Sequence, residues 1–163
     1  NPDHLSSVLE KLNEVGNKII VEKDRVSIKS IGRPKSSNMV TGIYPGFPTD
    51  AQAQWMAYMS IGDGESLITD TVYIDRFTHI SELNRLGSEI NIFQNIATIK
   101  GKPVLKGAKV MSTDIRASAS LIIAGLAAEG KTEISRVYHI DRGYENIEKK
   151  FQSLGADIVR QKE

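Results

Sequence analysis

Apolar residues recur along this chain at two spacings, one typical of helices and one of strands. In the first segment, 5–15, they fall three and four positions apart, and Gly16 follows the last of them. This pattern predicts an amphipathic helix that ends at a glycine, and Asn1 and Pro2 are favourable residues for its start. Two pairs of short apolar runs, each pair around a polar turn, predict β-hairpins: 19–21 with 26–28, and 90–93 with 96–99.

Two later helical segments differ in how their apolar residues are distributed. Residues 117–128 are apolar or small on every face, so we expect this helix to be buried. Residues 144–154 carry charges around one apolar stripe, as a surface helix does. The stripe consists of Ile147, Phe151 and Leu154. Two further runs are expected to form strands: 39–43 and 156–159.

The helix and strand segments occur twice in the same order, which indicates an internal repeat. One copy opens at Thr49-Asp50 and the next at Thr113-Asp114, roughly 65 residues later. Each opening is followed by an acidic residue with Gly, then by Val-Tyr, Asp-Arg and Leu-Gly dipeptides. A third copy, which lacks its opening, begins the chain. We expect a single partial α/β domain over 1–163, with repeats at 1–48 (partial), 49–112 and 113–163.

Composition narrows the function classes only in part. The 163 residues include 21 basic and 20 acidic side chains, so no charge excess favours nucleic acid or a membrane surface. No apolar run approaches the ~20 residues that span a bilayer, and there is no signal-peptide pattern. Cysteine is absent, and His4, His79 and His139 lack ligand spacing, so we expect no thiol chemistry and no metal site.

The repeated acids and arginines are the candidate functional residues. Thr-Asp at a helix start is a favourable N-cap, and architecture alone can explain its presence in both copies. Arg76 and Arg142 each follow an Asp at an expected helix start, where the two can form a local ion pair. An arginine there opposes the helix dipole, however, and a bound anion would compensate it. The copies also differ, because the second Thr-Asp is followed by Arg116 and the first by Gln52. From these residues alone, caps and a ligand site are both open.

Three segments closely resemble a known enzyme family: 47–54 (FPTDAQAQ), 113–121 (TDIRASASL) and 138–145 (YHIDRGYE). The same motifs occur in the same order in the C-terminal part of the enolpyruvyl transferases, most closely in the branch that serves peptidoglycan synthesis. The resemblance covers the chain from about Pro2 to its end. It implies an inside-out α/β prism whose two domains are each built from three βαβαββ units. This chain would supply about two and a half units of one domain.

The resemblance also implies a reaction. The enolpyruvyl group of phosphoenolpyruvate would move to the 3′-hydroxyl of UDP-N-acetylglucosamine with release of phosphate, the first committed step of peptidoglycan synthesis, without a cofactor. Such chemistry needs a base for the hydroxyl and positive groups around the phosphate and carboxylate. The matched positions are Asp50 as general base, Asp114 as a second acid near the reacting carbons, Arg116 and Arg142 facing phosphoenolpyruvate, Arg76 lining the cleft, and Val72 holding the nucleotide sugar through its backbone.

The same resemblance implies what must come from elsewhere. The family's proton donor and several substrate-binding residues belong to the other, N-terminal domain, so we expect the 163-residue chain to be inactive alone. The incomplete third unit would also leave apolar surface uncovered. Where the family has Glu-Asn-Arg, this chain has Ile74-Asp75-Arg76. Ile74 cannot make a polar contact of the kind that the family's Glu can make. A cytoplasmic location is expected. Two alternatives stay open: the shikimate-pathway enolpyruvyl transferase, and a non-catalytic binding module of the same fold.

Overall fold

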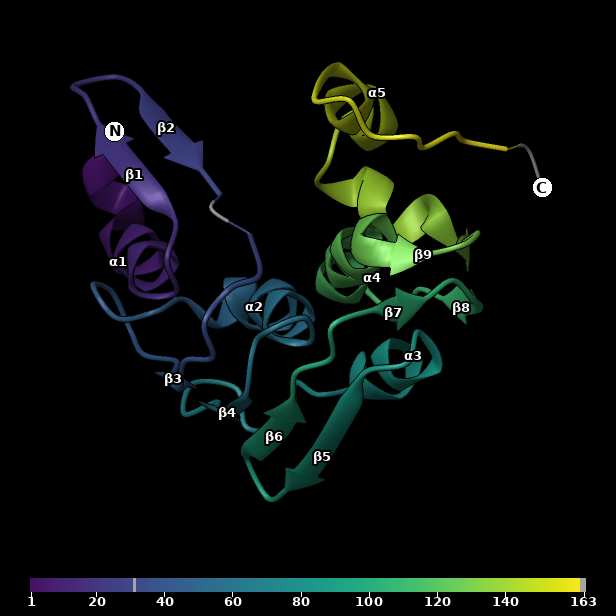
Figure 1. The fold of residues 1–163 in the computed structure, drawn as a ribbon, viewed down its shortest axis with the longest axis horizontal. Coiled ribbons are helices and arrows are strands. Elements are labelled where there is room, and N and C mark those ends of the chain that lie inside the picture. The colour runs from purple at the N-terminus through teal and green to yellow at the C-terminus, as the bar shows by residue number, and fades with distance from the viewer. Residues whose placement is uncertain (31, 162–163) are drawn as a thin grey trace.

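Two helices, α2 (Gln52–Met59) and α4 (Ile115–Ala127), pack against each other at the centre of the molecule (Figure 1). The computed structural model describes residues 1–30 and 32–161. Most of α2 is buried, as is α4 from Ala117 to Ile122. The buried helix expected over 117–128 is therefore confirmed for its first half.

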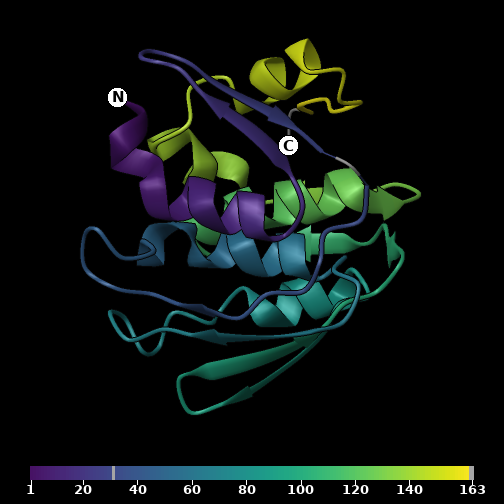
Figure 2. The same ribbon diagram turned by 60° about the vertical axis from the view of Figure 1, so that its left-hand side comes forward.

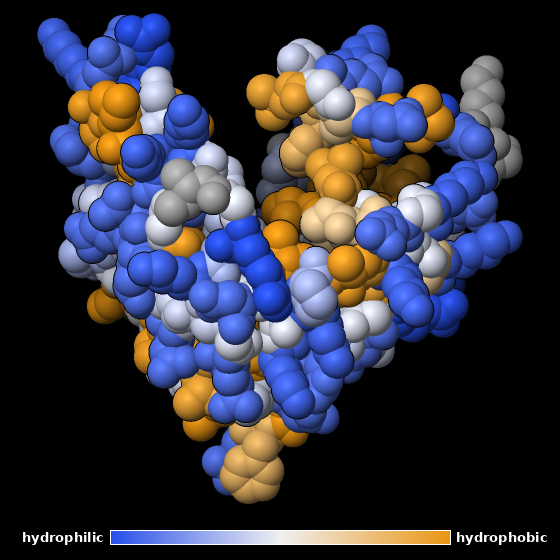
Figure 3. Space-filling view, in the orientation of Figure 1, coloured by the Kyte–Doolittle hydropathy of each residue, from blue (hydrophilic) through white to orange (hydrophobic). Residues whose placement is uncertain are grey.

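The second half of α4 contradicts the expected burial on every face. Ile123 is only partly buried, and Leu126 is 41% exposed. Apolar surface gathers on the arm of the molecule that carries α4 and the helix α5 (Ile147–Ser153), beside a deep notch (Figure 3). The side chains of Leu126 and Ala127, at the end of α4, therefore meet solvent.

A four-stranded sheet packs against α2 and against α3 (Ile80–Arg85). Its order is β3-β4-β6-β5, with β3 parallel to β4 and the other two pairs antiparallel. The hairpin expected at 90–99 is confirmed as β5 and β6. The expected strand 39–43 is shorter, because the chain folds back at Gly42, whose N–H donates to the carbonyl of Phe47 at 2.9 Å. The strands are β3 (Met39–Val40), β4 (Glu65–Thr69), β5 (Glu89–Phe93) and β6 (Ile96–Lys100).

Residues 105–135 contain two pairs of short parallel strands. β7 (Leu105–Lys106) pairs with β9 (Ala128–Glu129), and β8 (Lys109–Met111) pairs with β10 (Glu133–Ser135). The chain from β8 through α4 to β10 is therefore a crossover between parallel strands, like that from β3 through α2 to β4. Each Thr-Asp dipeptide lies between the first strand of its crossover and the helix that follows. The two dipeptides therefore occupy equivalent positions in the two crossovers.

The start of the chain forms the expected helix and hairpin. The 3₁₀ helix η1 (Pro2–Leu5) leads into α1 (Ser6–Glu14), and the side chain of Asn1 accepts from the backbone N–H of Asp3 at 3.1 Å. β1 (Lys18–Val21) and β2 (Val26–Lys29) pair in an antiparallel hairpin. In the part of the chain that the structure describes, this hairpin joins no other strand. Figure 2 shows it above α1, away from the four-stranded sheet.

The end of the chain departs from its predictions. A 3₁₀ helix, η3 (Val137–Arg142), precedes α5, so the regular helix begins at Ile147 rather than 144. Ile147 is buried, but Leu154 is 82% exposed, so the predicted stripe is only partly buried. Residues 156–159 form no strand. A strand needs a neighbour to satisfy its backbone groups, and none of the described residues pairs with this segment.

Three helices end in the same way. Gly16, Gly87 and Gly155 each follow the C-cap residue of their helix (α1, α3 and α5), with φ of 104°, 88° and 91°. This left-handed conformation favours glycine and ends a helix by redirecting the chain. The common geometry supports the proposed repeat. The environments differ, however, because Leu86 before Gly87 is 0% exposed in the main core, whereas Leu154 before Gly155 faces solvent.

Candidate active site

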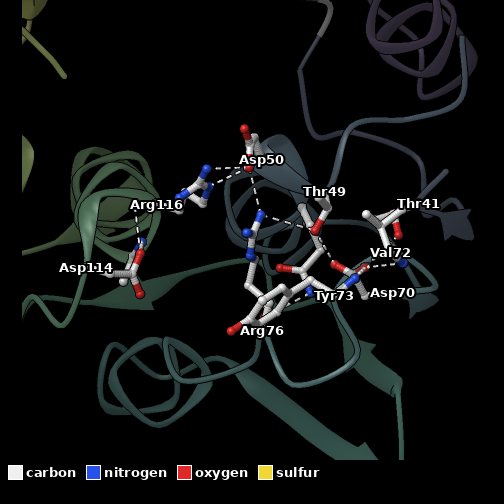
Figure 4. Close-up of polar contacts among 11 residues, drawn as sticks. Thr41, Thr49, Asp50, Asp70, Val72, Tyr73, Arg76, Asp114 and Arg116 are labelled. Carbon is white, nitrogen blue, oxygen red and sulfur yellow. Dashed lines mark hydrogen bonds and ion pairs between the residues drawn. The ribbon is translucent and has the colours of Figure 1, made fainter. Parts of the chain in front are cut away.

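The side chain of Asp50 is held between two arginines from different parts of the chain (Figure 4). Asp50 lies in the 3₁₀ helix η2 (Thr49–Ala51), which leads directly into α2. Its Oδ1 accepts from Arg76 Nη1 at 2.7 Å, and from Arg116 Nε and Nη2 at 2.6 and 2.5 Å. The side chain of Asp50 is nevertheless 64% exposed. A carboxylate with two cationic partners therefore remains open to a ligand.

The capping interpretation is wrong for Asp50. The N-cap of η2 is Pro48, and no side chain makes a capping hydrogen bond there. Partial burial would raise the pKa of Asp50, but hydrogen bonds and charge from Arg76 and Arg116 outweigh it and lower the pKa. Asp50 is thus ionised at neutral pH.

Arg76 is fixed by several groups around it. It lies in the turn that precedes α3, where its Nη1 also donates to Thr49 Oγ1 at 3.2 Å. Its guanidinium carbon stands 4.7 Å from the centre of the Tyr73 ring, a cation–π contact. Its carbonyl accepts from Nε2 of the buried Gln52 at 3.3 Å. The local pair considered for Asp75 and Arg76 is therefore not formed, since Arg76 turns to Asp50 instead.

Asp114, in contrast, caps its helix. Its Oδ1 accepts from the backbone N–H groups of Arg116 at 2.8 Å and Ala117 at 3.0 Å. Burial would raise the pKa of Asp114, but these backbone hydrogen bonds outweigh it and the pKa is lowered. The capping interpretation thus describes Asp114 and not Asp50. Two equivalent dipeptides have taken different structural roles.

Arg116 connects the two acids. Its backbone N–H binds Asp114, while its side chain crosses to Asp50 on the neighbouring helix segment. This crossing is possible because α2 and α4 pack side by side. Of the six candidate residues, the structure brings Asp50, Arg76, Arg116 and Asp114 into one connected group.

The other two candidates lie outside this group. Val72 is exposed in the loop after β4, and its N–H donates to Asp70 Oδ1 at 3.0 Å. Arg142 ends η3, rather than starting a regular helix as expected, and its side chain is exposed. The local pair considered for Asp141 and Arg142 is also not formed, because Asp141 binds Arg160 at 2.7 and 2.9 Å.

A family model matches residues 1–151. Its description is EPSP synthase (3-phosphoshikimate 1-carboxyvinyltransferase). The chain belongs to this family.

Curated relatives of this EPSP synthase family are similar over nearly the whole chain. The chain is 55% identical over 161 residues to the UDP-N-acetylglucosamine 1-carboxyvinyltransferase of Chlorobium luteolum, and 54% identical over 161 residues to that of Chloroherpeton thalassium. In both cases 99% of this chain matches 38% of the relative. The chain thus spans about two fifths of the length of these relatives.

Solved structures of the family share the fold. The enolpyruvyl transferase NikO from Streptomyces tendae superposes with a TM-score of 0.86 at 26% identity, over 96% of this chain and 36% of NikO. EPSP synthase from Acinetobacter baumannii superposes with a TM-score of 0.71 at 19% identity, over 96% of this chain and 37% of that one. The expected α/β class and enolpyruvyl transferase fold are therefore confirmed, with part of one domain present.

Asp70, which lies beside the candidate site, was missed by the sequence analysis. Asp70 is fully buried, and its carboxylate accepts from Thr49 Oγ1 at 2.6 Å and from Thr41 Oγ1 at 2.7 Å. A signal was available, because Thr69-Asp70 is a further Thr-Asp dipeptide and directly precedes the Thr-Val-Tyr segment. It follows a strand rather than preceding a helix, so it did not match the repeat.

The described residues 1–30 and 32–161 contain no group of three or more His, Cys, Asp or Glu side chains arranged to hold a metal ion. None of the helices within those ranges has the length and hydropathy required to cross a bilayer. The connected group instead pairs carboxylates with guanidinium groups. Such a group suits proton removal beside a bound anion.

Proposed function

We propose that this chain is part of an enzyme that transfers the enolpyruvyl group of phosphoenolpyruvate to the 3′-hydroxyl of UDP-N-acetylglucosamine, the first committed step of peptidoglycan synthesis. The observation that carries this proposal is the exposed Asp50 carboxylate between Arg76 and Arg116. The 55% identity to a UDP-N-acetylglucosamine 1-carboxyvinyltransferase supports this substrate over shikimate 3-phosphate. The matched EPSP synthase structure is only 19% identical.

Asp50 is the general base of the proposed reaction. It is ionised at neutral pH and has solvent-exposed surface, so a sugar hydroxyl can approach it. Removing that proton as the oxygen attacks carbon is the usual task of a positioned carboxylate. Asp114 is the second acid, and Val72 offers its backbone to the nucleotide sugar.

The arginines receive phosphoenolpyruvate. Arg116 and Arg142 face its phosphate and carboxylate, and Arg76 lines the cleft. Arg116 is bound to Asp50. An arriving anion competes for this guanidinium, and a weaker hold by Arg116 raises the pKa of Asp50. Anion binding therefore makes Asp50 a stronger base at the moment when the hydroxyl must be deprotonated.

The relatives are longer than this chain, and their additional length is where we place the second face of the active-site cleft. The chain matches 38% of them, and the proposed cleft needs a second face that carries the proton donor. We propose that this face is an N-terminal domain of the same protein, that no cofactor takes part, and that the enzyme works in the cytoplasm on both soluble substrates.

The test is phosphate release by the full-length protein with phosphoenolpyruvate and either UDP-N-acetylglucosamine or shikimate 3-phosphate. Turnover with the sugar nucleotide alone is expected. Turnover with shikimate 3-phosphate alone would assign the protein to the shikimate branch, and turnover with neither would favour a binding module. The 163-residue chain by itself is expected to release no phosphate above background, since it provides only one face of the proposed cleft.

A further inference from the structure

The carboxylate of Asp70 joins three segments that meet behind Asp50 and Arg76 (Figure 4). It follows β4 and is fully buried. Its Oδ2 accepts from Thr49 Oγ1 at 2.6 Å. Its Oδ1 accepts from Thr41 Oγ1 at 2.7 Å and from the backbone N–H groups of Val72 and Tyr73 at 3.0 and 2.8 Å.

Two of these four contacts lead to Arg76. The hydroxyl of Thr49 has one proton and donates it to Asp70, so its Oγ1 is available as an acceptor for Arg76 Nη1 at 3.2 Å. The backbone of Tyr73 is bound to Asp70, and its ring lies under the Arg76 guanidinium at 4.7 Å. Each oxygen of Asp70 thus supports one of the groups that hold Arg76.

We propose that Asp70 is a positioning residue that orients Arg76, and through Arg76 the carboxylate of Asp50, for the transfer reaction. Its effect on turnover rests on the proposed function, whereas its effect on Asp50 does not. Asp70 has no exposed surface, so a substrate cannot contact it directly. It acts by fixing which way Thr49 donates and where the ring of Tyr73 lies.

A charged carboxylate is required for this role. Two oxygens accept four hydrogen bonds, and all four partners donate. An asparagine would offer one acceptor oxygen and direct an NH₂ group at a donor. Burial would raise the pKa of Asp70, but the bonds from Thr49, Tyr73, Thr41 and Val72 outweigh it and lower the pKa, so the group stays ionised at neutral pH.

Asp63 offers a matched control. It lies just before β4, as Asp70 lies just after it, and its Oδ1 accepts from the backbone N–H of Ser36 at 2.8 Å. Asp63→Asn therefore removes one negative charge and weakens one loop anchor at the opposite end of the same strand. It has no contact with Asp50, Arg76 or Thr49 among the hydrogen bonds of the described residues.

The first experiment measures steady-state kinetics and melting temperature in the full-length protein. Asp70→Asn is expected to lower kcat by about ten- to a hundredfold, the scale of a small misplacement of reacting groups, with KM changed much less. Thr49→Val should give a similar loss, and the double variant should be no worse than the larger single effect. Asp63→Asn should retain the parent kcat. A folded Asp70→Asn enzyme with parental kcat, or losses that multiply in the double variant, would overturn the proposal.

The second experiment does not depend on turnover. The pKa of Asp50 is followed by the carboxyl ¹³C shift in the full-length protein with and without Asp70→Asn. Removing a nearby negative charge alone lowers the pKa of a carboxyl, whereas loss of a positioned arginine raises it. A rise at Asp50 supports the proposal, and a fall or no change contradicts it. Should Asp70→Asn fail to fold, Thr49→Val removes the same link without burying a new group and must produce the same rise.

Discussion

Arg116 and Asp50 are 66 residues apart in the chain, yet their side chains form an ion pair with Nη2 and Oδ1 separated by 2.5 Å. The pair exists because α4, which carries Arg116, packs along α2, which follows Asp50. One of the two proposed repeats therefore supplies the acid and the other supplies its partner. The candidate site lies where these two segments meet, so its geometry depends on how the two helices are packed.

Asp50→Asn should separate catalysis from stability. Asp50 caps no helix and is largely exposed, so the melting temperature of the full-length protein should stay within a degree or two of the parent. The amide cannot accept the sugar's proton, so kcat should fall by about 10²-fold or more. Phosphate release and thermal melting on the same samples provide the two measurements.

Two companion variants control that experiment. Asp114→Asn should also lower kcat with little change in melting, because asparagine caps a helix about as well as aspartate. Asp75→Asn, at an acid with no proposed role, should be mild. An Asp50→Asn enzyme as active as the parent would remove Asp50 from the chemistry.

Truncation to alanine should reveal the different structural roles of the two Thr-Asp dipeptides. Asp114→Ala removes an acceptor for two backbone N–H groups and should cost about 1 kcal/mol of unfolding free energy. Asp50→Ala removes ion pairs of a carboxylate that is 64% exposed and should change it by less than about 0.5 kcal/mol. Urea unfolding of both variants is the measurement. Equal losses would mean that Asp50 supports its helix in a way the structure does not show.

The core between α2 and α4 should be sensitive to truncation at Leu121. This side chain is 0% exposed, so Leu121→Ala should cost about 2–5 kcal/mol by leaving a cavity. Leu126→Ala on the same helix is the control, since Leu126 is 41% exposed and should lose much less. Ile123, which is only partly buried, should fall between them. The order is read from urea midpoints, and a more damaging Leu126→Ala would contradict the assigned packing of α4.

Stability should depend on pH through His79. Burial lowers the pKa of His79 to about 4, although the charge of Asp114 acts the other way. In the unfolded chain the pKa of this imidazole is about 6.5. Between these values the unfolded state takes up a proton that the folded state refuses, so the unfolding free energy should decrease as pH falls from about 6.5 to about 4, by up to about 3 kcal/mol.

The contribution of His79 to the pH dependence of the unfolding free energy can be separated from that of the acidic residues. Folding lowers the pKa values of Asp50, Asp70 and Asp114, so their stabilisation is lost only as pH falls further, below their usual range near about 4. His79→Phe should flatten the curve between pH about 4 and about 6.5. Unchanged pH dependence in His79→Phe would show that another group titrates in this window.

The local sequence pattern was enough to predict those helices and strands that depend mainly on residues close together in the sequence. The two hairpins, the capped helix at Asn1 and the buried start of α4 were all present as periodicity and turn chemistry. Asp50 and Asp114 were also selected as candidates, from repetition and from a family resemblance. Their difference did not, because a Thr-Asp dipeptide looks the same whether its carboxylate turns to its own helix or to an arginine 66 residues away.

The misses share a physical cause. Leu154 and Leu126 were expected to be buried from their apolar character, but burial depends on a neighbour that covers them. Residues 156–159 have strand composition, but no strand among the described residues pairs with them. Asp70 was missed because its role arises from Thr41, Thr49 and the loop after β4 meeting around one carboxylate. Each of these depends on contacts distant in sequence.

Because Gly87 and Gly155 share the same backbone geometry, the segment that follows Gly87 can be tested as a graft after Gly155. Both glycines redirect the backbone after a helix with φ near 90°, but only after Gly87 does the chain continue into a hairpin whose Ile90 and Ile99 share the core with Leu86. A duplicate of residues 88–100 spliced after Gly155 would leave its helix in the same direction. It would bring a ready-made apolar face to the bare Leu154. Transfer of this segment would show whether a hairpin alone is enough to bury the leucine before such a glycine.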